Sequence, residues 1–348
     1  TLDLNQGWQY RWGDSPLDER HRPVWASESL SGSGWHPFTF STPPDDRQGH
    51  PFIWMRVRLP AEYWPNPTLY LPDVLVAGEV YLDGRKIAQI GALEPASENK
   101  YRTSAWHLVP LPDDFAEKVL ALRIYSNYQA VIGLSTPPRI GYQAEVIRSI
   151  LMDRIDEILL GVLFVIIGPA SLLLYLRRRN QAFSAYLSFG AFTTCIGVHY
   201  ALSGSGPGLF PYTPTWVYFL IHMTFFLFPV GMFAFLEEIL SPGPWRLMRR
   251  IWQFHIWFAF LGLILDLLNM MALPILQFYL LGILAADVFV TLWVGVRAAL
   301  QGSAEARIVS VGTGLLVLSG LHDILAVYQL IPAWHNLFHW GGFAFVVS

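Results

Sequence analysis

Eight histidine and aspartate side chains lie inside or beside long apolar stretches of this sequence. A titratable side chain at the depth of a lipid bilayer is expensive, and such residues usually pair with one another or serve a pathway or a site. Each is therefore a candidate for function if the apolar stretches cross a membrane. The set is His199, His222, Asp266, Asp287, His322, Asp323, His335 and His339.

Two of these histidines have the spacing of a metal site. His335 and His339 are four residues apart, so they share one face of a helix and can reach the same ion. With His199 and the carboxylate of Asp323 they predict a zinc site. Two other interpretations stay open, namely hydrogen bonds between helices and a ligand pocket without metal.

Neighbouring helices must supply the partners of the buried carboxylates. His322 and Asp323 point about 100° apart on a helix, so at most one of them faces a common centre. The natural partner of Asp323 is then His222 or His339. We expect His255 to lie at the membrane interface.

Seven apolar segments predict membrane-spanning helices, because about 20 apolar residues cross a hydrocarbon core of about 30 Å. The last would continue past Ser348, which predicts a further cytoplasmic segment. The predicted spans are 155–176, 182–202, 214–238, 250–271, 274–299, 307–330 and 336–348.

Arginines on alternate connections predict the orientation of these helices. Residues 177–179, 246–250 and 297–307 carry arginines, whereas 203–213 and 331–335 carry no lysine or arginine. Arginine-bearing loops stay in the cytoplasm. We therefore expect the N-terminal half outside the cell and the C-terminus in the cytoplasm.

The first half of the chain predicts an all-β sandwich. Short apolar runs alternate with turn-forming residues, and Asp83-Gly84 between two such runs is typical of a hairpin turn. We expect a domain at 1–146, a helical connector at 147–154 and the membrane helices at 155–348. The predicted strands are 8–12, 36–40, 53–59, 68–71, 78–82, 86–90, 106–109, 119–125 and 139–144.

Long loops at one end of the sandwich predict a ligand site, because binding residues concentrate on loops held by a rigid scaffold. The adjacent Asp45 and Asp46 make calcium a further candidate beside zinc. Solvated loops with no ligand are the alternative. The candidate ligand-binding residues are Asp45, Arg47, His50, Lys100, Tyr101, Arg102 and Tyr128.

Composition excludes some partners. The net charge is −3, and no run of lysine or arginine suggests a polyanion, so nucleic acid is not an expected partner. The single cysteine, Cys195, lies in an apolar segment, so the outer domain cannot depend on a disulfide.

The first half resembles the galactose-binding-like jelly roll, as in the sugar-binding domain of β-galactosidase relatives. Five segments carry the resemblance in order: GWQY at 7–10, GWHP at 34–37, WMRVR at 54–58, VYLDG at 80–84 and LALRI at 120–124. The resemblance implies a jelly-roll fold and, less directly, a carbohydrate ligand.

The second half resembles the bacterial seven-transmembrane receptors with diverse intracellular signalling modules. The resemblance rests on LLLYLRRR at 172–179, LSGLHDIL at 318–325 and GGFAF at 341–345. It implies a receptor that relays a signal from a small molecule or glycan to a cytoplasmic module in the same chain, with the bilayer and a second copy as further partners. The fragment itself would not be an enzyme.

An enzyme is the alternative. The histidine pattern is also similar, more loosely, to that of the progestin–adiponectin receptor and alkaline ceramidase group. That similarity implies a metal-dependent intramembrane hydrolase.

Overall fold

A computed structural model describes most of the chain. The described residues are 1–27, 30–40, 44, 47–74, 77–91, 93, 105–126, 132–134, 136–178, 184–203, 215–240, 246–268, 270–301, 304–328, 330–331 and 336–348. They form two compact units that divide near residue 154.

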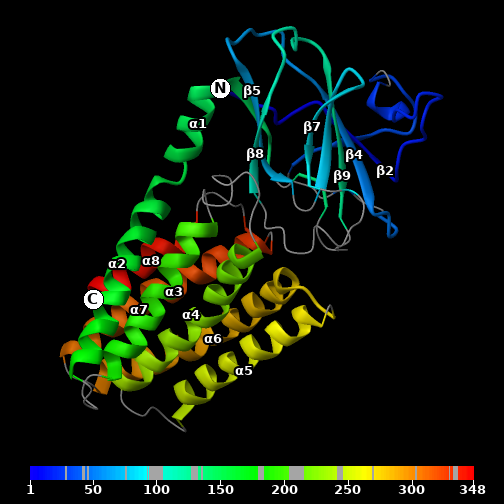
Figure 1. Ribbon diagram of the computed structural model, residues 1–348. Helices are drawn as coiled ribbons and strands as arrows, with labels where there is room; N and C mark the ends of the chain where they lie inside the picture. The colour runs from blue at the N-terminus through cyan, green and yellow to red at the C-terminus, as the bar shows by residue number, and fades with distance from the viewer. Residues whose placement is uncertain are drawn as a thin grey trace. The chain divides into compact units, whose positions relative to one another are not determined.

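The first unit is built on two antiparallel sheets (Figure 1). The predicted strands are confirmed, except that the short β1 escaped prediction and residues 143–144 begin a helix. One sheet has the order β1 (Leu2–Asp3), β10 (Arg139–Tyr142), β5 (Pro67–Val74) and β8 (Ala105–Pro110). The other has the order β3 (His36–Phe38), β2 (Trp8–Trp12), β4 (Phe52–Arg58), β9 (Val119–Tyr125), β6 (Ala77–Leu82) and β7 (Arg85–Ile90).

The hairpin between β6 and β7 follows the predicted turn. Leu82 pairs with Arg85, and both intervening residues, Asp83 and Gly84, have positive φ angles of 46° and 80°. Two left-handed residues in succession define the turn whose twist matches that of the paired strands.

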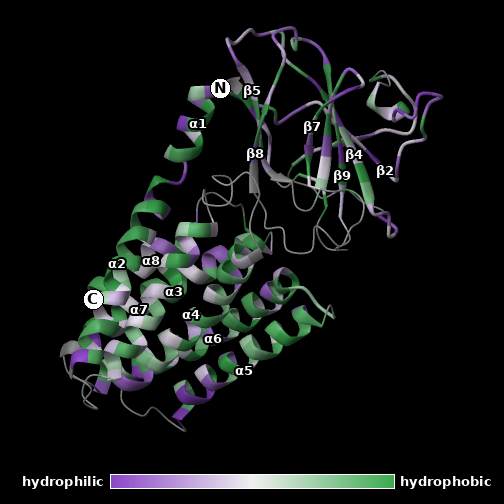
Figure 2. Ribbon diagram, viewed as in Figure 1, coloured by the Kyte–Doolittle hydropathy of each residue, from purple (hydrophilic) through white to green (hydrophobic). Residues whose placement is uncertain are grey.

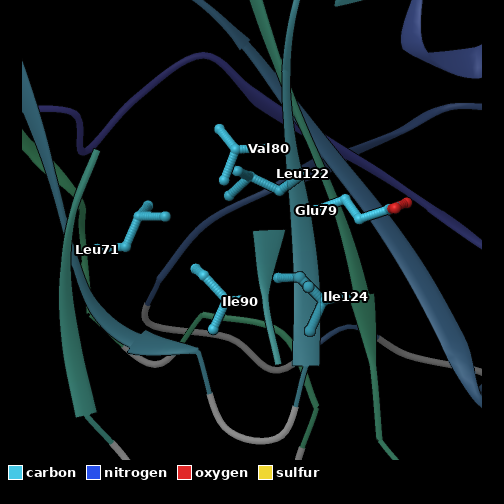
Figure 3. A pocket seen from close by; sticks show the side chains of 7 residues that line it. Leu71, Glu79, Val80, Ile90, Leu122 and Ile124 are labelled. Atoms are coloured by element: carbon cyan, nitrogen blue, oxygen red, sulfur yellow. The ribbon is translucent and has the colours of Figure 1, made fainter. Parts of the chain in front are cut away.

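The core lies between the two sheets. Val80 and Leu122 of the six-stranded sheet and Leu71 of the four-stranded sheet belong to one buried cluster. The hollow between these side chains has no room for a water molecule, so it is a packing gap and no ligand site (Figure 3). Glu79 points away from this hollow because successive side chains on a strand face opposite sides of the sheet.

A second, smaller cluster covers the other face of the six-stranded sheet. Trp25 of the short helix η1 (Val24–Ala26) packs there with Trp54 and Tyr81. Beside it, the fully buried Arg56 lies 3.7 Å from the centre of the Trp35 ring. An arginine over an aromatic face is stabilised by the negative ring face, so this face is part of the folded structure.

Glu79 is at the centre of an ionic network on this face. Its carboxylate accepts hydrogen bonds from Tyr81 Oη at 2.7 Å, Lys86 Nζ at 3.0 Å and Arg123 Nη1 at 3.0 Å. Arg123 also pairs with Asp14. Burial raises the pKa of Glu79, but these three donors outweigh burial and hold it below its ordinary value of 4.5.

This network predicts an acid-sensitive sandwich. A lowered pKa means that the charged Glu79 contributes stability above about pH 4.5 and that this contribution is lost as the pH falls further. We expect Glu79→Gln to destabilise the sandwich by about 2 kcal/mol at pH 7, with the difference from wild type shrinking below pH 4.5. Protease resistance of residues 1–154 in the full chain, measured against temperature at several pH values, checks this. A constant difference from pH 7 to pH 3 would contradict it.

After residue 154, the described residues form seven helices. They agree with the predicted spans to within a few residues, and Figure 2 shows them to be mainly hydrophobic. Among the described residues, α2, α4, α5, α6 and α7 are long and apolar enough to cross a membrane. The helices are α2 (Ile155–Arg178), α3 (Ser184–Ser203), α4 (Thr215–Ile239), α5 (Leu247–Leu267), α6 (Leu273–Gln301), α7 (Ala304–Val327) and α8 (Phe338–Val347).

Glycines let α2 and α3 approach closely. A Cβ atom at Gly168 would lie 2.6 Å from the backbone nitrogen of Thr194, and one at Gly197 would lie 2.7 Å from that of Val165. Small residues at such contacts replace the hydrophobic driving force that is absent between helices in lipid.

The helix that precedes α2 belongs to the first unit. Helix α1 (Gln143–Met152) buries Val146 and Ile150 and contacts β5 and β10. A turn at residues 153–154 separates it from α2. The predicted connector therefore starts earlier than residue 147, and it is not one continuous helix with α2.

Candidate functional site: the junction at the start of α8

Asp323, near the end of α7, caps the start of α8. Its carboxylate accepts the backbone N–H groups of Leu337, at 2.9 and 3.0 Å, and of Phe338, at 2.8 Å. The first N–H groups of a helix have no partner inside the helix, and a carboxylate also complements the positive helix end. His322 Nδ1 lies 2.9 Å from Asp323 Oδ1.

The first turn of α2 holds the same end of α8 from another side. Asp156 Oδ2 lies 2.9 Å from Nε2 of His339 and accepts a hydrogen bond from Trp340 Nε1 at 3.0 Å. The neighbouring Glu157 accepts one from the Asn336 side chain at 3.2 Å. We call Asp156, Glu157, Asp323 and their partners the α8 junction.

Helix α3 completes the α8 junction with aromatic contacts. The His339 ring is 2% exposed and meets Tyr200 edge-on, with the ring centres 5.7 Å apart. Nδ1 of the adjacent His199 lies 3.2 Å from the carbonyl oxygen of Ile221 on α4. The carboxylates of the junction accept hydrogen bonds from helix ends and rings, so its chemistry is that of a clamp between helices.

The other two predicted carboxylates, Asp266 and Asp287, have their partners outside the α8 junction. Asp287 Oδ2 lies 2.8 Å from Nε2 of His255, whose ring stacks on Phe233. Fully buried Asp266 accepts the N–H of Leu273 at the start of α6. His222 is also buried, on α4. The predicted polar cluster is therefore spread over several helix contacts.

Two expectations about these residues are wrong. Asp323 pairs with His322 and the start of α8, and among the described residues it bonds to neither His222 nor His339. The neighbours His322 and Asp323 contact each other, which does not bear on the expectation that at most one of them faces a common centre. His255 is 1% exposed and paired, so it is no interfacial residue.

The predicted zinc site is not assembled by the part of the chain that the structure describes. There, no three His, Cys, Asp or Glu side chains gather closely enough to hold a metal ion. His199 meets a carbonyl oxygen, His339 meets Asp156, and Asp323 meets a helix end. His335 lies outside the described residues. The hydrolase alternative gains no support from these residues.

The loop residues predicted to bind ligand are only partly described. Arg47 donates to the carbonyl oxygens of His50 and Ser126, at 3.0 and 2.9 Å, and thus ties two loops together. Burial lowers the pKa of Arg47. His50 is exposed. Outside the described residues lie Asp45, Asp46, Lys100, Tyr101, Arg102 and Tyr128.

Sequence analysis missed half of the α8 junction. Asp156 and Glu157 stand at the very start of an otherwise apolar span, and Trp340 sits one residue after His339. Adjacent carboxylates at the start of a membrane helix are a signal that could have directed attention there, but the residues they hold are about 180 positions away in the chain.

The comparison with known families decides the class of the protein. Residues 153–348 match the model of the family described as 7TM diverse intracellular signalling. The chain belongs to this family. A 7TM diverse intracellular signalling protein is an integral membrane receptor that works with a signalling module. The seven helices α2–α8 and the sandwich before them agree with that architecture.

Other comparisons add little to the family assignment. No curated protein matches the chain. Solved structures with partial likeness include a Faecalibacterium prausnitzii β-glucuronidase, at 15% identity over 36% of this chain and 20% of that one, with a TM-score of 0.26. The β-glucuronidase from Ruminococcus gnavus has 14% identity over 39% and 26%, with a TM-score of 0.25. These scores are too low to support an argument about fold or ligand, and the chain spans a quarter or less of the first enzymes' length.

Proposed function

We propose that the sandwich senses a ligand outside the cell and that α1, α2 and α8 relay the signal to a cytoplasmic module of the same chain. The observation that carries this proposal is the α8 junction. In the first turn of α2, Asp156 holds His339 and Trp340 of α8, and Glu157 holds Asn336 just before α8. A displacement of the start of α2 thus acts directly on α8.

The first half of the relay is the attachment of α1 to the sandwich. Arg139 of β10 donates to Asp3 at 2.8 Å, to Ser149 at 2.8 Å and to Asp153 at 2.9 Å. Burial lowers the pKa of Arg139, but the two carboxylates raise it above its ordinary value overall. With Val146 buried against the strands, α1 moves with the sandwich and not as a loose tether.

The second half of the relay is the covalent link. Only Asp153 and Arg154 separate α1 from α2. Short, structured links transmit displacement, whereas Gly/Ser-rich linkers behave as flexible coils. A ligand that moves or tightens the sandwich would therefore bias the position of the first turn of α2.

The positions of the arginines support the proposed orientation. Arg177 lies in the last turn of α2, Arg249 and Arg250 lie in the first turn of α5, and Arg297 lies near the end of α6. Arginines near span ends favour the cytoplasmic side. The proposal thus places the chain in a bacterial inner membrane with the sandwich in the periplasm and α8 leading into the cytoplasm.

A glycan or another small molecule is the proposed ligand, and a homodimer is the proposed signalling form. The loops that hold Arg47 and His50 remain the candidate site. Thermal-shift measurements of the purified full chain with common mono- and disaccharides test the carbohydrate suggestion, and no shift with any of them would remove it. Mass photometry in nanodiscs tests the dimer.

The relay can be tested without knowing the ligand. We expect Arg139→Gln to speed amide hydrogen exchange in residues 338–342 by about 2- to 30-fold, the range of typical coupling between distant sites. Inserting Gly-Gly between Asp153 and Arg154 should abolish this effect, because the link becomes flexible. The matched control is the same insertion between Asp113 and Asp114 in a sandwich loop, which should leave the effect intact. Unchanged exchange in α8 after Arg139→Gln would overturn the relay.

A further inference from the structure

Helix α1 has a second apolar face that the sandwich does not cover. Its first face, with Val146 and Ile150 at 0% and 3% exposure, packs against the strands. Ile147, Leu151 and Met152 remain 37%, 40% and 58% exposed. An ordinary surface helix is apolar on the buried side and polar on the other, so α1 departs from the usual pattern.

The two faces lie on opposite sides of the helix. At about 100° per residue, Val146 and Ile150 are about 40° apart, and Ile147, Leu151 and Met152 spread over the far side. Arg148 falls between Leu151 and Met152 on that side. Among the described residues no carboxylate forms an ion pair with Arg148. The uncovered face is therefore apolar with a cation within it, and the exposed Glu145, which pairs with the N-terminal amine, lies at its edge beside Met152.

Chain connectivity keeps this face close to the bilayer. Met152 is three residues before Ile155, where the first membrane-spanning helix begins. Three residues reach at most about 11 Å. The headgroup layer on each side of the hydrocarbon core is about 5–7 Å thick. The last turn of α1 thus lies in or next to the headgroups whatever the angle between α1 and α2.

We propose that this face of α1, made of Ile147, Arg148, Leu151 and Met152, binds the surface of an anionic phospholipid bilayer. The apolar side chains enter the boundary between headgroups and acyl chains, and the Arg148 guanidinium binds lipid phosphate. Helices that lie in the interface combine an apolar face with Lys or Arg in this way. The sandwich is then held to the membrane by lipid as well as by the chain.

A second copy of the chain fits this face less well. Stable protein interfaces bury about 1,200–2,000 Å² in total, which three half-exposed side chains on a ten-residue helix cannot provide. In a symmetric pair the same patch meets itself, so Arg148 would face its own counterpart. Lipid phosphate offers the opposite charge.

Spin labels report the surroundings of this face directly. In a Cys195→Ser background, single cysteines replace Ile147 or Leu151, and the full chain is placed in vesicles of phosphatidylethanolamine and phosphatidylglycerol. The measured quantity is the ratio of label collisions with oxygen, which enriches in lipid, to collisions with a water-soluble nickel chelate. Arg85→Cys, in the β6–β7 hairpin, is the aqueous reference, and Ile166→Cys, exposed on α2, is the lipid reference.

We expect the ratio at Ile147→Cys and Leu151→Cys to exceed that at Arg85→Cys by about five-fold and to approach that at Ile166→Cys. Replacing phosphatidylglycerol with phosphatidylcholine should lower this ratio. Arg148→Gln should remove the dependence of the ratio on lipid charge, because one arginine near an anionic surface changes partitioning about five-fold. A ratio equal to the aqueous reference would overturn the proposal. Spectral broadening that disappears on dilution with unlabelled chain would also overturn it, in favour of a second copy.

Discussion

Gly197→Ala is expected to destabilise the helical unit by about 1–3 kcal/mol, although alanine is the better helix former. The added Cβ would lie 2.7 Å from the nitrogen of Val165 and 2.9 Å from the carbonyl carbon of Phe164. These are backbone atoms of α2 and cannot rotate away, so the two helices must separate. Far-ultraviolet circular dichroism during unfolding in mixed micelles measures the effect.

Gly314→Ala is the matched control for this prediction. Gly314 also lies inside a membrane helix, α7, but among the described residues no atom outside its own stretch of helix backbone lies within 4 Å of the position that its Cβ would take. The substitution should be neutral or stabilise by up to about 1 kcal/mol, the difference in helix propensity. Equal changes in the free energy of unfolding for Gly197→Ala and Gly314→Ala would show that α2 and α3 do not pack as closely as described.

Asp323→Ala is expected to release the start of α8. The substitution removes the acceptor of the Leu337 and Phe338 N–H groups, and hydrogen bonds to a charged group contribute about 1.5–3 kcal/mol each. We expect amide exchange at residues 338–341 to accelerate by about 10- to 100-fold. Mass spectrometry of peptides from the exchanged full chain provides the measurement.

Asp323→Asn distinguishes loss of the helix cap from a general loss of structure. Asparagine keeps one side-chain oxygen and is a good helix cap, so exchange in α8 should rise much less than in Asp323→Ala. Exchange in α5 should stay unchanged in both variants, because the α8 junction includes no residue of α5 (Leu247–Leu267). If both variants leave α8 as protected as wild type, Asp323 does not cap this helix.

Local sequence patterns predicted the elements well, and the reason is that each pattern needs few neighbours. The turn at Asp83-Gly84 follows from the backbone freedom of two adjacent residues. The spans follow from the thickness of a bilayer. The join between strand β10 and α1 was placed too late, since residues 143–144 are compatible with either structure until packing on β5 and β10 decides.

Side-chain partners could not be predicted from spacing. Asp323 had been expected to pair with His222 or His339, yet it accepts hydrogen bonds from the N–H groups that begin α8. His255 had been assigned to the interface because of its place along the chain. Packing of α5 against α4 and α6 buries it beside Phe233 and Asp287 instead.

The sequence by itself determined the two classes of structure, the β-sandwich and the apolar helices, and which residues were too polar for their surroundings. Alternation of side chains and length of apolar runs are properties of the chain that no distant contact can alter. Only the tertiary structure decided which carboxylate meets which helix. Asp156 and His339 are 183 positions apart, and which of many possible partners satisfies a buried charge depends on how close the helix backbones come, a distance that the glycines of α2 and α3 help to set.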